Sequence, residues 1–401
     1  MLELKKKLHF KSENYLYLLE VIKSQNRNVR LVGGVVRDAI LGIDSKDVDI
    51  TTSMRPEEVE KVFTSLGCKV IPTGIKFGTV SVLYNGELFE ITTLRKDVSS
   101  DGRHSQVEYT DDFYIDALRR DFTINALSYC PFEEKIYDYF DGVKDLESGL
   151  VRFIGDADLR IKEDYLRILR FFRFFGKFGK KIDQNSLNFC IKNKSFIKNL
   201  SRERVKSEFD LILKLPNYSD VIILMNSISI LQEILPISYL KLDEFIDAQN
   251  IANKFSTYLA NETKYALLFL KGGDISYAKL LDLKFSRIEA RIITDLLSIQ
   301  RQKNIDEYFL KEIWLERDNF CQFFIFISAI FQVKEKIESM FLLLKNQQKP
   351  LFPINGNDLL SLGISGVMIG RELAYIKRKW IESDFALTKQ ELINIAKKNE
   401  K

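Results

Sequence analysis

The sequence has few of the residues that build histidine, zinc or disulfide chemistry. Its 401 residues include two histidines, His9 and His104, and four cysteines that lie far apart without a C-x-x-C pair. The histidine count excludes a His-rich metal site and a phosphohydrolase domain of the His-Asp type. The cysteine spacing argues against a zinc site or a disulfide framework and is typical of a reducing compartment.

Long apolar runs are also missing. The longest, residues 320–333, spans about 14 residues and contains two glutamines and a serine. It is too short to cross a bilayer and predicts a buried helix. The first residues, MLELKKKLHFKSE, lack the apolar core of a signal peptide. We therefore expect no membrane partner and a cytoplasmic location, or an organellar one after processing.

Charge is abundant, and it is spread unevenly. The first 150 residues carry 25 acidic and 20 basic side chains, whereas residues 151–401 carry 31 acidic and 40 basic ones. An acidic first part joined to a basic second part fits a metal-bearing catalytic module followed by a module that binds a polyanion. Ordinary solvated surface is the alternative, and charge alone does not separate the two.

Strand and helix signals divide the chain near residue 156. The length predicts two to four domains. Before the division strand signals alternate with helix signals, and after it helical signals dominate. This predicts an α+β part followed by an all-α part. The expected elements that matter below are a leading helix within 1–30, strands across 67–93, a flexible polar loop at 97–112, a helix at 113–128 and one long helix at 156–178.

The pattern of residues 31–50, LVGGVVRDAILGIDSKDVDI, predicts strand, glycine turn, short helix, loop and strand. Gly33 and Gly34 would let a bound phosphate approach the backbone and a helix N-terminus. Asp47 and Asp49 are two apart on a strand, so both carboxylates point to one face. Two carboxylates so placed repel each other, and a divalent cation relieves this. The segment therefore predicts phosphoryl or nucleotidyl transfer.

Two further residues complete this candidate catalytic centre. Glu90, on a neighbouring strand, can act as a third carboxylate ligand, with an exposed edge glutamate as the alternative. Arg37 can offer a fork of donors to phosphate, unless it only pairs with Asp38 along the helix. Asp47, Asp49 and Glu90 would hold two Mg²⁺ ions that activate an attacking RNA 3′-hydroxyl and neutralise a triphosphate.

A second group of candidate residues lies in the segment RRDFTIN, residues 119–125. Two arginines before an aspartate near a helix start suit contacts to phosphate and sugar, and Arg120 can bridge to a ribose. Asp121 and Asn125 join it as candidate nucleotide-binding residues. A salt-bridged helix face is the alternative for this segment.

A third group lies in the predicted helix of residues 156–178. Asp164 and Arg167 are three apart, so their side chains would meet on one helix face. A carboxylate and a guanidinium side by side match the edge of cytosine or adenine and reject guanine and uracil, because a mismatch buries unpaired polar groups. Arg170 and Arg173 continue the face towards phosphates. Solvent-facing ion pairs are the alternative.

These motifs, in this order, resemble the class II tRNA nucleotidyltransferase and poly(A) polymerase family. The resemblance rests on GGVVRD, DVD, RRDFTIN, EDYLRILRFFRF and the ER-x-x-x-E of residues 203–208, and it covers about residues 28–215. A weaker likeness to the family's tail continues at 352–366. The stretch 92–112 resembles the flexible loop of full CCA-adding members, particularly the mitochondrial and alpha-proteobacterial kind.

The resemblance implies a polymerase-β-like nucleotidyltransferase head, a small mixed sheet with helices, followed by an all-α neck, body and tail. It also implies addition of C, C and A to tRNA 3′ ends from CTP and ATP, without a nucleic-acid template and with release of diphosphate. By position, the resemblance implies a helix-stabilising role for residues 203–208 and these roles for candidate residues: metal ligands, Asp47 and Asp49; nucleotide contacts, Gly34 and Arg37; a ribose-side contact, Arg120; and the protein template with its supporting arginines, Asp164, Arg167, Arg170 and Arg173. The expected divisions are a head at 1–150, a neck at 151–215, a body at 216–300 and a tail at 301–401.

Other activities stay open from the sequence. The family includes enzymes that add only CC, enzymes that add only A, and poly(A) polymerases. Because CC-adding members lack the flexible loop, its presence favours addition of the full CCA. A catalytically silent RNA-binding protein is an alternative of another class, against which the intact acids Asp47, Asp49 and Glu90 argue.

Overall fold

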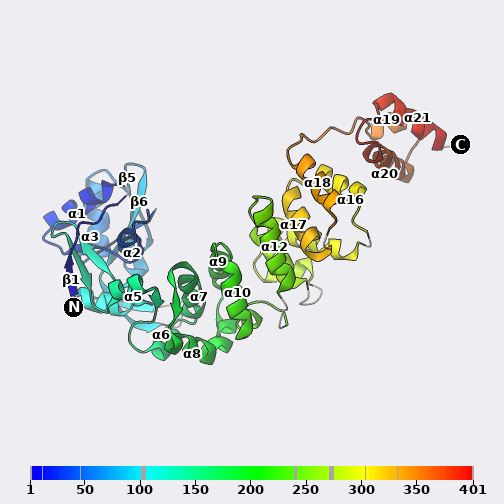
Figure 1. The fold of residues 1–401 in the computed structure, drawn as a ribbon. Coiled ribbons are helices and arrows are strands. Elements are labelled where there is room, and N and C mark those ends of the chain that lie inside the picture. Colours follow the sequence, from blue (N-terminus) through cyan, green and yellow to red (C-terminus); the bar gives the residue numbers. More distant parts are fainter. Residues whose placement is uncertain are drawn as a thin grey trace. The chain divides into compact units, whose positions relative to one another are not determined.

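The computed structural model describes residues 2–399 except 11, 46, 101–104, 239–241, 271–274, 303 and 332, so part of the loop expected at 97–112 lies outside the described residues. The chain forms two compact units, Met1–Pro236 and Ile237–Lys401. The first contains the sheets and the second is helical (Figure 1). This confirms the predicted α+β class. The four-part division expected from the sequence is finer than this and stays a prediction.

One sheet of eight strands organises the first part of unit 1. Its strand order is β1-β10-β9-β2-β3-β6-β5-β4. The β3–β6 pair is parallel and the other neighbours are antiparallel, so the sheet is mixed as expected. The strands are β1 (Leu2–Lys5), β2 (Val29–Val32), β3 (Val48–Thr52), β4 (Lys69–Gly74), β5 (Thr79–Tyr84), β6 (Glu87–Thr93), β9 (Ser128–Cys130) and β10 (Lys135–Asp138).

Short helices flank this sheet. Apolar side chains of α1, α2 and α3 pack with the sheet strands into one core, which includes Leu18, Val36, Ile50 and Phe63. The helical segments are α1 (Asn14–Ser24), α2 (Gly34–Ile40), α3 (Pro56–Ser65), η1 (Ile75–Phe77), α4 (Phe113–Leu118), η2 (Thr123–Asn125) and α5 (Gly142–Ser148).

Local sequence signals predicted several of these elements. The strand–turn–helix–strand order of residues 31–50 is confirmed, with Gly33 in the left-handed region at φ 72°. The Asn85-Gly86 pair forms a two-residue turn between β5 and β6, and both residues have positive φ. A two-residue turn with positive φ at both positions matches the twist of the strands that it joins.

Three expectations about this part need correction. The leading helix expected within 1–30 is present as α1, but the strand β1 precedes it. The polar stretch 97–112, expected to be a loop, contributes to a two-stranded sheet of β7 (Arg95–Ser100) and β8 (Ser105–Tyr109). The helix expected at 113–128 ends at Leu118, because Phe122 is extended (φ −118°, ψ 150°) and the Asp121 carboxylate accepts its N–H.

The second part of unit 1 is helical and begins at residue 157. It comprises α6 (Ala157–Glu163), α7 (Leu166–Phe178), α8 (Gln184–Asn193), η3 (Lys194–Asn199), α9 (Arg202–Leu213), α10 (Tyr218–Ser227) and α11 (Leu231–Ile234), with a short parallel pair of β11 (Leu150–Val151) and β12 (Lys181–Ile182).

The single helix expected at 156–178 is therefore two helices. Asp164 breaks it with an extended backbone, φ −157° and ψ 105°. Its carboxylate accepts the Leu166 N–H, and its carbonyl accepts the Arg167 N–H, so Asp164 starts α7. A short acidic side chain that bonds its own backbone in this way favours a helix start over a helix interior.

Unit 2 consists of helices joined by short connections. The expected buried helix at 320–333 is present as α17, and most of its side chains are buried. No helix in the described part of the chain is long and apolar enough to span a bilayer. The elements are α12 (Asp243–Lys254), α13 (Asn261–Phe269), α14 (Tyr277–Asp282), α15 (Arg287–Ser298), η4 (Ile299–Arg301), α16 (Glu307–Glu316), α17 (Phe320–Phe331), α18 (Glu335–Lys345), α19 (Gly356–Leu360), α20 (Val367–Glu382) and α21 (Lys389–Asn399).

The contact between α5 and η2 yields a test of the fold. A methyl group on Gly142 would overlap the carbonyl of Thr123, whose carbon would lie 2.9 Å from it. We expect Gly142→Ala to cost about 1–3 kcal/mol, as overpacking does when backbone has to move. Differential scanning calorimetry measures the loss. Gly370→Ala, at an open position in α20, is the control and should leave the unfolding midpoint as high as in the wild type. An unchanged Gly142→Ala midpoint would contradict this packing.

Candidate active site

A polar cavity of about 680 Å³ in unit 1 gathers residues from four separate stretches of the chain. They come from the glycine turn and α2, from the loop and start of β3, from the end of α4 through η2, and from α7. The cavity thus brings together every predicted site residue except Glu90. Its lining residues are Gly33, Gly34, Val35, Arg37, Asp38, Ser45, Asp47, Asp49, Arg119, Arg120, Asp121, Asn125, Asp164, Arg167, Arg170, Arg173, Phe174 and Lys177.

Asp47 and Asp49 line the cavity from β3 and the residue before it. Burial raises the pKa of the Asp49 carboxyl; Arg120 opposes this effect, and the negative charges of Glu90 and Asp47 add to it. Asp49 and Glu90 are register partners on the parallel strands β3 and β6, so their backbones are neighbours. Carboxylate oxygens under mutual repulsion are the donor set that a hard divalent cation prefers.

The third predicted metal ligand, Glu90, does not line the cavity that Asp47 and Asp49 share. Within the described ranges, no three His, Cys, Asp or Glu side chains form a group that could hold a metal ion. Asp47, Asp49 and Glu90 therefore do not converge as a triad, and Glu90 is an exposed side chain outside the cavity lining. Asp47 and Asp49 fit a metal ion as a pair, and the role of Glu90 stays a prediction.

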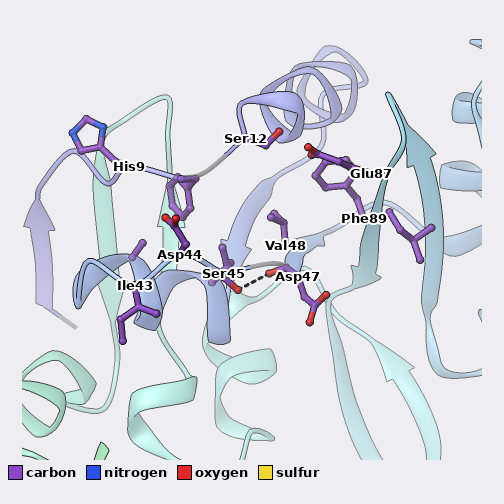
Figure 2. A pocket seen from close by; sticks show the side chains of 13 residues that line it. His9, Ser12, Ile43, Asp44, Ser45, Asp47, Val48, Glu87 and Phe89 are labelled. Atoms are coloured by element: carbon purple, nitrogen blue, oxygen red, sulfur yellow. Dashed lines mark hydrogen bonds between the residues drawn. The ribbon is translucent and has the colours of Figure 1, made fainter. Parts of the chain in front are cut away.

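A second cavity, of about 400 Å³, lies against the same loop (Figure 2). Its lining includes His9, Asp44 and Phe89, and it shares Ser45 and Asp47 with the first cavity. Figure 2 shows the Asp47 carboxylate and the Val48 side chain on opposite sides of the chain, as alternation on a strand requires. The Ser45 hydroxyl donates to the Asp47 carbonyl at 3.0 Å.

Arg37 is held inside the protein by its neighbours. Its Nε and Nη2 lie 2.8 and 2.7 Å from Asp38 Oδ1, and its Nη1 donates to Asn125 Oδ1. Its side chain is only 6% exposed, and its guanidinium faces the ring of Phe178. Burial lowers the pKa of Arg37, while Asp38 raises it. The ion pair with Asp38, which the sequence left as the alternative, is present.

Asp121 links this arginine cluster to α7. Its Oδ1 accepts Asn125 Nδ2 at 3.0 Å, and its Oδ2 accepts Arg170 Nε at 2.7 Å. Burial would raise the pKa of the Asp121 carboxyl, but Arg170 and the Asn125 hydrogen bond outweigh burial and hold it below the ordinary value. The carboxylate therefore serves contacts within the protein, and Asn125 joins Arg37 to Asp121.

The proposed base-reading residues are positioned by α9 and by backbone carbonyls. Arg204 Nη2 donates to Asp164 Oδ2 at 2.7 Å. Arg167 Nη1 donates to Glu163 at 2.6 Å, and its Nη2 donates to the Arg119 carbonyl at 3.0 Å. Asp164 and Arg167 do not share a continuous helix face as expected, yet both line the cavity.

Two arginines of the predicted set pair with carboxylates that do not line the cavity. Arg173 forms an ion pair with Glu208 of α9, which agrees with a supporting role for residues 203–208. Arg120 pairs with Asp116 at 3.2 Å, and a Cβ on Gly33 would lie 3.0 Å from its Nη1. The positive φ of Gly33 and this close approach both favour glycine at this position.

Sequence reasoning missed several lining and supporting residues. Lys177 carried a signal, because it continues the i+3/i+4 spacing of Arg170 and Arg173 along α7. Asp116 carried one too, because it stands three and four residues before its partners Arg119 and Arg120. Arg204 could not be paired from the sequence, since it lies 40 residues from its partner Asp164.

The Asp121–Arg170 contact predicts a pH-dependent stability. Asp121→Asn should destabilise the protein by about 3 kcal/mol at pH 7, because Arg170 loses its buried carboxylate. Since the native pKa lies below the ordinary value of 3.8, this stabilisation is present above that value and is lost as the pH falls through the native pKa. In urea unfolding, the difference in the free energy of unfolding between wild type and variant should therefore become smaller in acid.

The control breaks an exposed ion pair in the same unit. Lys162→Gln removes the contact with Asp158, and the Lys162 side chain is 49% exposed. Its unfolding curve should follow the wild type at both pH values. A gap for Asp121→Asn that is absent at pH 7, or constant with pH, would contradict the assignment.

Comparison with known proteins identifies the family of this chain. Residues 29–152 match the family described as "Poly A polymerase head domain". Residues 179–239 match one described as "Probable RNA and SrmB-binding site of polymerase A". The sequence is 34% identical over 401 residues to the human protein named "CCA tRNA nucleotidyltransferase 1, mitochondrial", an alignment that covers 96% of this chain and 90% of that protein.

Bacterial proteins agree with this result. A CCA-adding enzyme of Staphylococcus aureus is 32% identical over 293 residues, covering 70% of this chain and 67% of that protein. The crystal structure of the Bacillus stearothermophilus CCA-adding enzyme with CTP has a TM-score of 0.75 at 24% identity, and covers 97% of each chain. That structure supports the fold alone. The chain belongs to the family of CCA tRNA nucleotidyltransferases, the CCA-adding enzymes.

Proposed function

We propose that this chain adds C, C and A to the 3′ end of tRNA, using CTP and ATP and no nucleic-acid template. The observation that carries the proposal is the single cavity that joins Asp47 and Asp49 to Asp164 and Arg167. One pair supplies carboxylates for phosphate chemistry, and the other supplies a base-reading edge. Family membership over nearly the full chain supports the same reaction.

The reaction needs a hydroxyl, a triphosphate and a metal at one place. Divalent metal use is typical of this family, and we propose Mg²⁺, held by Asp47 and Asp49 with Glu90 as a further candidate ligand. When bound, Mg²⁺ lowers the pKa of the attacking RNA 3′-hydroxyl and neutralises charge on the triphosphate. We assign contacts to the sugar or phosphates to Arg120, which interacts electrostatically with Asp49 and lines the same cavity.

Nucleotide choice follows from the pattern of donors and acceptors. The Asp164 carboxylate accepts from the exocyclic amine of cytosine or adenine, and the Arg167 guanidinium donates to the adjacent ring nitrogen. Guanine and uracil present an oxo group beside an N–H, which leaves both side chains unpaired. Arg204 and the Arg119 carbonyl fix the two side chains before any nucleotide binds.

Full CCA addition is favoured over partial addition by the β7–β8 hairpin. The stretch 92–112 resembles the loop that the family's CC-adding members lack, and its described residues pair from Arg95 with Tyr109 to Ser100 with Ser105. A poly(A) polymerase remains the second candidate, because the family described for residues 29–152 carries that name. The cytoplasmic location stays a prediction, and the human relative is named mitochondrial.

The test is to incubate the protein with tRNA lacking CCA, Mg²⁺ and all four nucleoside triphosphates, and then to sequence the RNA 3′ ends. We expect CCA and no further residues. Products that end in CC would contradict full CCA addition, and a long A tract would favour the poly(A) polymerase. RNA binding without any addition would leave only the RNA-binding protein.

Asp47→Ala in the same assay should abolish addition of both C and A while tRNA still binds, because one of the paired carboxylates is lost. Asp44→Ala is the matched control. Asp44 is an exposed acid three residues earlier that lines only the second cavity, and its loss should leave addition intact. Activity retained by Asp47→Ala would refute the metal assignment.

Asp164→Ala should relax the choice of nucleotide, so that GTP and UTP are incorporated as well as CTP and ATP. The loss of the acceptor removes the penalty for an oxo group at the base edge. Asp158→Ala, which removes an acid of α6 outside the cavity lining, should keep the wild-type choice. Competition among labelled triphosphates measures both. Continued exclusion of G and U by Asp164→Ala would refute the base-edge argument.

A further inference from the structure

The catalytic cavity has one cation that differs from the others. Among the cavity's described side chains, six arginines each lie within 3.2 Å of a carboxylate oxygen. Lys177 Nζ lies 3.7 Å from its nearest recorded carboxylate oxygen, Asp38 Oδ2. Its side chain is also the most exposed of the seven, at 40% against 33% for Arg170.

Asp38 does not neutralise this lysine. Its Oδ1 already takes Arg37 Nε and Nη2, so one carboxylate serves two cations. The 3.7 Å contact is too long for a hydrogen bond. This end of the cavity therefore holds an excess of positive charge, and the Lys177 ammonium is the part of it that faces solvent.

Lys177 is also at the correct end of α7 for a nucleotide's phosphates. Arg167 lies in the first turn of the helix, and Lys177 lies ten residues later. With a rise of 1.5 Å per residue the two positions are about 15 Å apart along the axis. Both side chains line the same cavity, and Arg170 and Arg173 lie between them. A nucleotide that places its base at Arg167 can extend its phosphates along this stripe.

We propose that Lys177 binds the terminal phosphates of the incoming CTP or ATP, the part that leaves as diphosphate. This role differs from the phosphate contact that the sequence suggests for Arg37, whose guanidinium is buried against Asp38 and Asn125. An ammonium group suits the task because it is a compact charge with three rotatable donors. The inference rests on the proposed function for the identity of the nucleotide.

The experiment compares the binding of CTP and CMP to the whole protein in Mg²⁺, by equilibrium dialysis. Lys177→Ala should weaken CTP binding about tenfold, as loss of a charge-assisted hydrogen bond does, and should leave CMP binding unchanged. ATP should follow CTP, because the phosphates are common to both. Lys177→Arg keeps the charge and should restore most of the difference between CTP and CMP. Lys181→Ala, an exposed lysine of β12, is the control and should bind like the wild type.

Three results would overturn the proposal. Equal loss of CTP and CMP binding would show that the Lys177–Asp38 contact only supports the fold, and a lower thermal midpoint without nucleotide would accompany it. Unchanged CTP binding with weaker tRNA binding would assign the lysine to an RNA phosphate. Unchanged binding of CTP, CMP and tRNA would show that Lys177 contacts none of these ligands. Lys177→Gln, which keeps the stem and removes the charge, replaces Lys177→Ala if that variant does not fold.

These outcomes are independent of the proposed function. If the wild type adds nothing to tRNA, the proposed function fails, yet the binding of CTP and CMP can still be compared. If the wild type adds CCA and Lys177→Ala binds CTP normally, only the inference about Lys177 fails.

Discussion

The active site depends on one buried chain of hydrogen bonds and ion pairs. It runs from Asp38 to Arg37, then to Asn125, Asp121 and Arg170. Two of its links join elements that are distant in sequence: Arg37 of α2 donates to Asn125 of η2, and Arg170 of α7 donates to Asp121. Removing one partner of such a buried pair leaves an unpaired charge, which costs several kcal/mol, so the links hold together or are lost together. Because of this chain, α7, which carries the proposed base-reading Arg167, is held against η2 and α2.

The same chain decides which side chains remain available to substrate. Arginines that the sequence assigns to nucleotide contacts are partly committed to the protein: Arg37 to Asp38 and Asn125, and Arg173 to Glu208. They set the position and the potential of the cavity. Among the described side chains that line the cavity, the cation with the longest contact to a carboxylate is Lys177, at the end of α7 away from Arg167. A site built in this way has its positive charge fixed in advance, so binding an anionic nucleotide costs little reorganisation.

Local patterns made the catalytic half of the site predictable. The strand–turn–helix–strand order around Gly33 follows from spacing within twenty residues, and the structure has it. The break at Asp164 was not predictable from the apolar stripe of the expected helix, because the stripe continues across the break. Arg204, forty residues away, holds the Asp164 carboxylate in its final position. The β7–β8 hairpin was also missed, since its residues are polar and lack the β-branched alternation by which strands are recognised. The sequence therefore did not show the pairing of distant residues such as Arg204 and Asp164, nor a hairpin built from polar residues.

The central claim is that one nucleotide spans this cavity, with its base at Asp164 and Arg167 and its phosphates between the β3 carboxylates and Lys177. The most direct measurement is an experimental structure of the protein with CTP and Mg²⁺. The account predicts that the cytosine amine and ring nitrogen lie within hydrogen-bond distance of Asp164 and Arg167, with the metal at Asp47 and Asp49. A base bound elsewhere, or a triphosphate that points away from these carboxylates, would contradict it.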